Sequence, residues 1–161
     1  MRTFLGRQVL LGLACSIAAA TPSSPASAAE QFRIDPNHTF VHFAVVHTGV
    51  SSVHGRFSVP KGSASLDAAK QEASITVQID ARSVDTGVKQ LDGILIGEQF
   101  FDVAKFATAT FSGRAVRFAE GVPMEFEGDL TVKGITRPVH LTAERFVCQQ
   151  VTVHSARVHR C

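Results

Sequence analysis

The sequence predicts an all-β protein, an antiparallel barrel or sandwich, from three observations. Residues 74–80 (SITVQID) and 124–133 (MEFEGDLTVK) alternate apolar and polar side chains, the two-residue period of a strand with one buried face. Strand-like segments recur along much of the chain, and turn residues separate them. Residues 85–97 show a helical pattern instead. Six or more antiparallel strands that share one apolar face fit a barrel or a sandwich.

Each expected element follows from this patterning. Gly113 lies where the apolar face changes phase, which predicts a β-bulge, and Gly134 predicts a turn. Asp85 or Thr86 is expected to cap the short helical insert. The buried face of that helix is expected to consist of Val88, Leu91 and Leu95. The expected strands cover residues 31–35, 39–48, 55–67, 74–80, 107–118, 124–133 and 139–143.

The first 28 residues have the pattern of a secretory signal peptide. A basic start (Arg2, Arg7) precedes an apolar run at 9–20, and Ala26-Ser27-Ala28 provides the small residues of a cleavage site. The run is shorter than the roughly 20 residues that span a bilayer. We expect removal of residues 1–28, no stable membrane insertion afterwards, and a periplasmic or secreted protein. A retained membrane anchor is the alternative.

The composition argues against nucleic acid as a partner. Cleavage would remove two of the 16 basic residues and none of the 14 acidic ones, so the mature chain would have 14 of each. Lys and Arg are scattered singly rather than gathered in a basic patch. Twelve Phe with no Trp or Tyr make the expected interior purely apolar. Ordinary core packing and the lining of an apolar cavity both explain this composition.

Four histidines, His38, His42, His47 and His54, are the candidates for metal ligands. Their spacing matches no known zinc site, and Asp35 would point away from His38 on an extended strand. We therefore expect turn, strand and loop histidines and no metal site. The chain has no Gly-x-Ser-x-Gly motif and no phosphate-binding loop, so we expect neither a catalytic residue nor a cofactor. Asp80 and Arg82 are expected to pair at the surface.

Several short segments between about residue 32 and residue 146 occur in a specific order. They include residues 34–39 (IDPNHT), 91–95 (LDGIL) followed by 100–102 (FFD), and 128–136 (GDLTVKGIT). In this order they resemble the YceI-like family of periplasmic polyisoprenoid-binding proteins. The resemblance implies a lipocalin-like antiparallel β-barrel whose long apolar cavity holds an isoprenoid chain.

The same resemblance indicates the residues that would contact an isoprenoid lipid. Phe40 is included for its strand position alone, whereas the others lie within the matching segments. The candidate ligand-binding residues are Phe40, Phe43, Phe57, Leu91, Leu95, Phe100, Phe101 and Phe111. Ile94 stands where the family usually has His, and Ile96 where it often has a basic residue, which implies a less charged ligand.

The C-terminal part departs from the family. After Cys148 the segment resemblance ends, as a truncated or frameshifted reading frame would produce. We therefore expect a domain at 29–147 and an atypical tail at 148–161 that supplies one short strand at most. The barrel would then be incomplete, with low stability and an aggregation-prone open edge. A Cys148–Cys161 disulfide and two free thiols are both open.

The expected function is the binding or carriage of an apolar isoprenoid lipid, polyprenyl or quinone-like, by a protein that is not an enzyme. Two alternatives come from other classes: an enzyme that acts on such a lipid, and a partner module of a membrane redox protein. The sequence leaves the oligomeric state open, a homodimer included.

The signal-peptide interpretation predicts that exported protein begins at or near Ala29. N-terminal sequencing of the exported fraction measures this directly. An intact Met1 in that fraction would show that the leader is retained.

Overall fold

The computed structural model describes residues 28–58 and 60–160, and β-strands make up most of its regular structure. All of the expected signal peptide except Ala28 lies outside these residues. Two short helices occur, the 3-10 turn η1 (Ala81–Ser83) and α1 (Lys89–Leu95). The strands are β1 (Glu30–Arg33), β2 (Val41–His47), β3 (Ser51–Phe57), β4 (Lys61–Asp67), β5 (Glu72–Asp80), β6 (Val84–Asp85), β7 (Thr108–Ala119), β8 (Val122–Val132), β9 (Ile135–Thr142), β10 (Gln149–Val153) and β11 (Ala156–Arg160).

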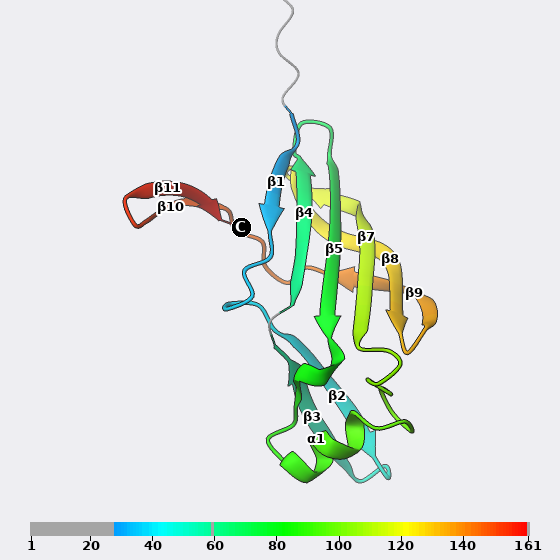
Figure 1. The fold of residues 1–161 in the computed structure, drawn as a ribbon. Coiled ribbons are helices and arrows are strands. Elements are labelled where there is room, and N and C mark those ends of the chain that lie inside the picture. Colours follow the sequence, from blue (N-terminus) through cyan, green and yellow to red (C-terminus); the bar gives the residue numbers. More distant parts are fainter. Residues whose placement is uncertain (1–27, 59, 161) are drawn as a thin grey trace, which may run out of the picture.

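The strands form three antiparallel sheets. The largest has the order β1-β4-β5-β7-β8-β9 and curves around an inner face, while β2-β3-β6 and α1 lie at its lower end (Figure 1). The β10–β11 hairpin is a separate sheet that projects from the body. This confirms the all-β antiparallel class. The large sheet remains open, with β1 and β9 as its two edges.

The alternating sequence places apolar and polar side chains on opposite faces of the large sheet. One cross-strand row runs through Ala64, Ile75, Gly113, Gly128 and Val139 on the inner face. On the outer face, hydroxyl groups of facing residues hydrogen-bond across neighbouring strands, as in Ser65–Ser74 at 2.7 Å and Thr131–Thr136 at 2.8 Å. The strands therefore present an apolar inner surface and a hydrated outer one.

Two expectations about the strands are wrong. The single strand expected at 55–67 is two strands in different sheets. The strand is interrupted around Pro60, whose side chain is fully buried and which has no backbone N–H to donate to a neighbouring strand. The β-bulge falls near Val116, where the β7–β8 register shifts, rather than at Gly113. Gly113 instead leaves room for the Phe111 ring, which an added Cβ would approach to 2.6 Å. The turn at Gly134 is confirmed, with φ +73°.

The helix is shorter than expected and begins differently. Its N-cap is Val88, which offers no side-chain cap, so the expectation of a cap from Asp85 or Thr86 is wrong. Thr86 instead donates its hydroxyl to Asp92 Oδ1 at 2.6 Å, which links the preceding turn to the helix. The expected buried face is only partly formed: Leu91 and Leu95 are half-buried. Val88 is 56 % exposed, because it precedes the helix instead of lying on its inner face.

The C-terminal tail forms more structure than expected. Instead of one short strand at most, residues 149–160 make two strands that pair with each other, Val151 opposite Val158. This hairpin adds no strand to the large sheet. Cys148 is disulfide-bonded. Cys161, the candidate partner, lies outside the described residues.

The free edge of β9 carries a proline. The Ala143 N–H bonds to Met124 O on β8, so odd-numbered residues direct their backbone groups toward β8. Even-numbered residues, Pro138 among them, direct theirs toward the free edge. Pro138 has no N–H to offer there.

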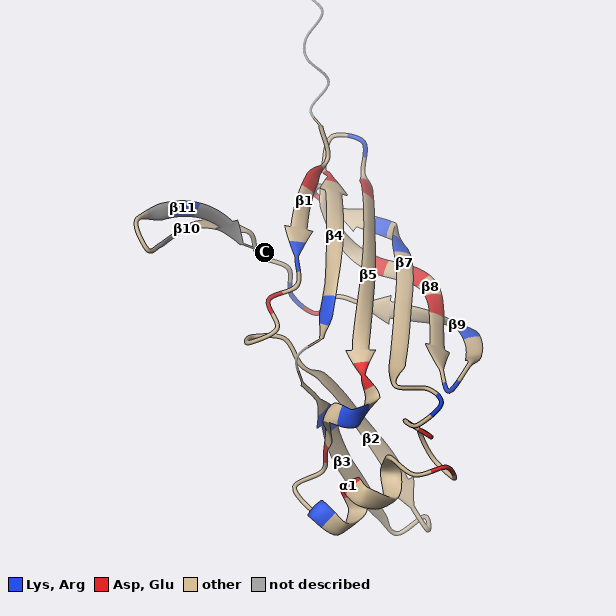
Figure 2. Ribbon diagram, in the orientation of Figure 1, with Lys and Arg blue, Asp and Glu red and all other residues tan. Residues whose placement is uncertain are grey.

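Charged residues of both signs are interspersed over the body (Figure 2). The expected Arg82–Asp80 pair is confirmed, with 2.8 Å between guanidinium and carboxylate. On the outer face, Glu125 accepts from Arg117 and contacts His140, and these two neighbours hold the pKa of the Glu125 carboxyl below its ordinary value. No helix of the described ranges has the length and apolarity needed to cross a membrane.

We predict that Gly128→Ala destabilises the protein by about 1–3 kcal/mol, because its Cβ would overlap the backbone of Ser112 and Gly113. Gly93→Ala in α1 is the matched control, since a Cβ there meets no atom and Ala favours helix by roughly 1 kcal/mol. Urea unfolding of both variants measures the difference. Equal midpoints would contradict the close approach of β7 and β8.

Candidate functional site

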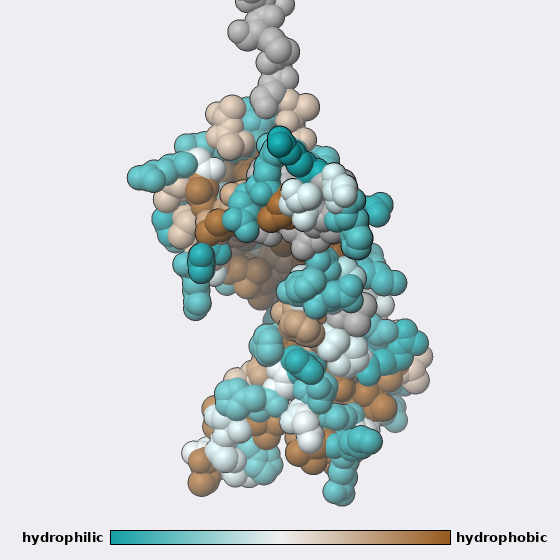
Figure 3. All heavy atoms as spheres, turned by 90° about the vertical axis from the view of Figure 1, so that its left-hand side faces the viewer, coloured by the Kyte–Doolittle hydropathy of each residue, from teal (hydrophilic) through white to brown (hydrophobic). Residues whose placement is uncertain are grey.

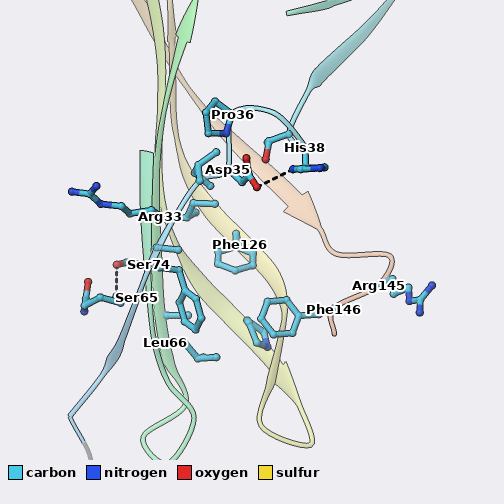
Figure 4. A pocket seen from close by; sticks show the side chains of 18 residues that line it. Arg33, Asp35, Pro36, His38, Ser65, Leu66, Ser74, Phe126, Arg145 and Phe146 are labelled. Atoms are coloured by element: carbon cyan, nitrogen blue, oxygen red, sulfur yellow. Dashed lines mark hydrogen bonds and ion pairs between the residues drawn. The ribbon is translucent and has the colours of Figure 1, made fainter. Parts of the chain in front are cut away.

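A cavity of about 820 Å³ lies on the inner face of the large sheet. On the face of the molecule that Figure 3 shows, hydrophobic side chains line the bottom of a recess. The walls come from β1, β4, β5 and β8, and from the segment that follows β9 (Figure 4). The apolar residues that line it are Phe32, Ile34, Pro36, Ala64, Leu66, Ala73, Ile75, Pro123, Phe126 and Phe146.

The strand register explains why these side chains meet. Phe32 lies opposite Ala64, and Ala64 lies opposite Ile75, so the three form one inner row across β1, β4 and β5. Phe126 reaches the same space from β8, and Phe146 enters from the chain beyond β9 (Figure 4). The curvature of the sheet thus turns a flat apolar face into a concave one.

The titratable side chains that line the cavity lie at its rim. His38 Nδ1 and Asp35 Oδ2 are 2.9 Å apart above the apolar wall. The expectation that Asp35 points away from His38 is wrong, because residues 36–38 form a turn instead of continuing a strand. Arg33 and Arg145 also line the rim, but their guanidinium groups point away from the cavity in Figure 4. The interior therefore offers little to a hydrogen-bonding or charged ligand.

Three of the eight candidate residues from the sequence meet in an aromatic cluster. The Phe43 and Phe57 ring centroids are 5.5 Å apart, and those of Phe57 and Phe101 are 5.3 Å apart. The cluster joins the β2–β3 hairpin to the segment after α1. These elements lie at the lower end of the large sheet (Figure 1). It is a second apolar region rather than part of the cavity lining.

The other five candidates lie apart from one another. Phe40 is 42 % exposed and lies beneath the Arg56 guanidinium, 5.2 Å from ring centroid to Cζ. Phe100 is 47 % exposed, and Phe111 is buried within the sheet at 6 %. Leu91 and Leu95 are half-buried on α1. None of the eight lines the 820 Å³ cavity, so their contact with a ligand stays a prediction.

Only some of the residues that line the cavity could be identified from the sequence pattern. Ile75 and Phe126 lie on the apolar faces that the alternating segments 74–80 and 124–133 predict. Phe32, Leu66 and Phe146 lacked such a signal, because only the curvature of the sheet brings them to the same space.

The four histidines do not converge. His42, His47 and His54 are exposed on the β2–β3 hairpin, and His38 occupies the turn expected for it. Within residues 28–58 and 60–160, no three His, Cys, Asp or Glu side chains are arranged to hold a metal ion.

A curved antiparallel sheet around an apolar cavity is an architecture that can enclose a small apolar molecule. Comparison with known families assigns the chain to a family. It belongs to the YceI-like domain family, whose profile matches residues 32–160. The match continues past residue 146, where the segment resemblance was expected to end.

Individual relatives agree with this assignment. The chain is 34 % identical over 136 residues to Protein YceI of Salmonella arizonae, covering 84 % of this chain and 71 % of the relative. It is 38 % identical over 107 residues to a UPF0312 protein of Pseudomonas savastanoi pv. phaseolicola, covering 66 % of this chain. The match spans 56 % of that relative, little more than half its length.

Among solved structures, the Campylobacter jejuni YceI protein superposes with a TM-score of 0.53 at 26 % identity. The superposition covers 73 % of this chain and 70 % of the other.

We predict that Phe146→Asp strongly weakens the binding of a fluorescent apolar probe, because an unpaired carboxylate would enter the apolar cavity. Val147→Asp is the matched control, since the Val147 side chain is next to Phe146 in the sequence but is 51 % exposed. Fluorescence titration, with circular dichroism to verify folding, measures both. Equal probe binding in the two folded variants would exclude Phe146 from the binding surface.

Proposed function

We propose that this protein binds an isoprenoid lipid and carries it, with the hydrocarbon chain held in the cavity on the inner face of the large sheet. The observation that supports this most directly is the cavity itself, about 820 Å³ with ten apolar lining residues. Binding sites for small molecules commonly measure about 300–1,000 Å³. Family membership supports the same proposal.

The chemistry of the walls suits a hydrocarbon. An isoprenoid chain has no hydrogen-bonding groups, so it gains nothing from polar walls and gains free energy when apolar surfaces lose water. Phe32, Phe126 and Phe146 supply large apolar surfaces from three separate segments. The outward direction of Arg33 and Arg145 keeps their charges away from the chain.

The proposal extends to the second apolar region. The cluster of Phe43, Phe57 and Phe101 would continue the binding surface for a chain longer than the cavity. Export through the signal peptide would place the carrier in the periplasm, with the domain at 29–147 and the tail at 148–161 as its two parts. A lipid carrier in an aqueous compartment must keep the isoprenoid chain away from water, because the chain is insoluble there.

Mass spectrometry of an organic extract tests the proposal on the full chain expressed with its leader. We expect a prenyl lipid in the extract of the wild-type protein and of Val147→Asp, and a strongly reduced amount in Phe146→Asp. Addition of the recovered lipid to delipidated protein should restore the complex.

Other outcomes would replace the proposal. A lipid that is chemically changed during incubation would favour an enzyme. A protein that neither retains nor takes up prenyl lipid, but binds a membrane redox protein, would favour the partner module.

A further inference from the structure

Arg137 lies on the cavity side of the large sheet although it is charged. It pairs with Leu130 on β8, and Leu130 pairs with Phe111 on β7. Residues of one cross-strand row project to the same side of a sheet. Phe126, four residues before Leu130 on the same strand, lines the cavity, so Arg137 shares the inner face with it.

Its surroundings make Arg137 distinctive. Across the paired rows from β4 to β9, the other inner positions of the described strands are Gly, Ala or larger apolar residues. The acidic residues of β8 nearest to it, Glu127 and Asp129, belong to outer rows, opposite His140 and Pro138. Within the described part of the chain, the exposed Arg137 guanidinium has no hydrogen-bond or ion-pair partner. It is therefore available to a ligand on the inner face.

We propose that Arg137 binds an anionic oxygen head group, of which phosphate is the type, on the lipid whose chain fills the cavity. This inference rests on the proposed function. A planar guanidinium presents donors that match a phosphate in a bidentate arrangement, which makes it the side chain best suited to this group.

The spacing agrees with one elongated ligand. Four residues of strand separate Phe126 at the cavity from Leu130 beside Arg137, about 13 Å along β8. Between them lies Gly128, which has no side chain to obstruct a path along the inner face. Arg137 on β9 would thus contact the head group of a ligand whose hydrocarbon chain lies in the cavity. The apolar residues Ile94 and Ile96, which by themselves imply a less charged ligand, lie on α1 and in the turn after it. They are therefore on a different element from Arg137, which lies on β9.

Paired ligands test the inference on the full chain. Geranylgeranyl phosphate and geranylgeraniol have the same hydrocarbon chain and differ in the anionic head group. We expect Arg137→Gln to weaken binding of the phosphate by about tenfold, the loss of roughly one charge-assisted interaction. It should leave binding of the alcohol within about twofold, and Arg137→Lys should restore part of the loss. Arg114→Gln, on the outer face of β7, should change neither.

Each outcome is decisive. Equal phosphate affinity in Arg137→Gln and the wild-type protein would overturn the head-group role while leaving lipid binding intact. Equal loss of phosphate and alcohol binding in Arg137→Gln would show a packing effect instead. Inorganic phosphate that competes as well as the lipid phosphate would identify a free-anion site and overturn the inference. Failure of the wild-type protein to bind either prenyl ligand would refute the proposed function itself.

Discussion

The apolar inner face of the six-stranded sheet is the constraint on which the rest of the structure depends. The buried apolar side chains of the described residues are few, Ile79, Ala81, Val84 and Phe111 among them, and the fully buried ones include Pro60 and Pro123. Most inner-face residues keep partial contact with water. An apolar surface in that state gains free energy when something covers it, at about 25 cal/mol per Å². Curvature of the sheet covers part of it, and a bound hydrocarbon would cover more.

Curvature in turn depends on residues that have small or no side chains. Gly113 and Gly128 face each other across β7 and β8, where an added Cβ on either would overlap the neighbouring strand. Near Val116 the register shift adds a local bend. These features lie between the cavity-lining residues of β5 and those of β8, so the shape of the cavity follows from the backbone as much as from its walls.

The sequence predicted the faces of the strands better than their arrangement in space. The alternation at 74–80 and 125–132 assigns inner and outer residues correctly, because a strand has a fixed period of two. It could not predict that Pro60 separates two sheets, or that the turn at 36–38 brings His38 to Asp35, since these depend on local backbone geometry.

The candidate site shows the same limit. Family motifs selected Phe43, Phe57 and Phe101, and the structure brings these three together, although in a cluster outside the described cavity. Phe32 and Phe146 are far apart in the sequence and have no shared pattern, and only the closing curve of the sheet makes them neighbours.

Pro138 has a consequence for how copies of this protein behave at high concentration. A free strand edge invites intermolecular strand addition, the first step toward fibrillar assembly. A strand added to β9 would pair with Thr136, His140 and Thr142 but would find no donor at Pro138, in the middle of the ladder. Pro138 thus disfavours the addition of a further strand at this edge, so the open sheet is protected from polymerising through β9.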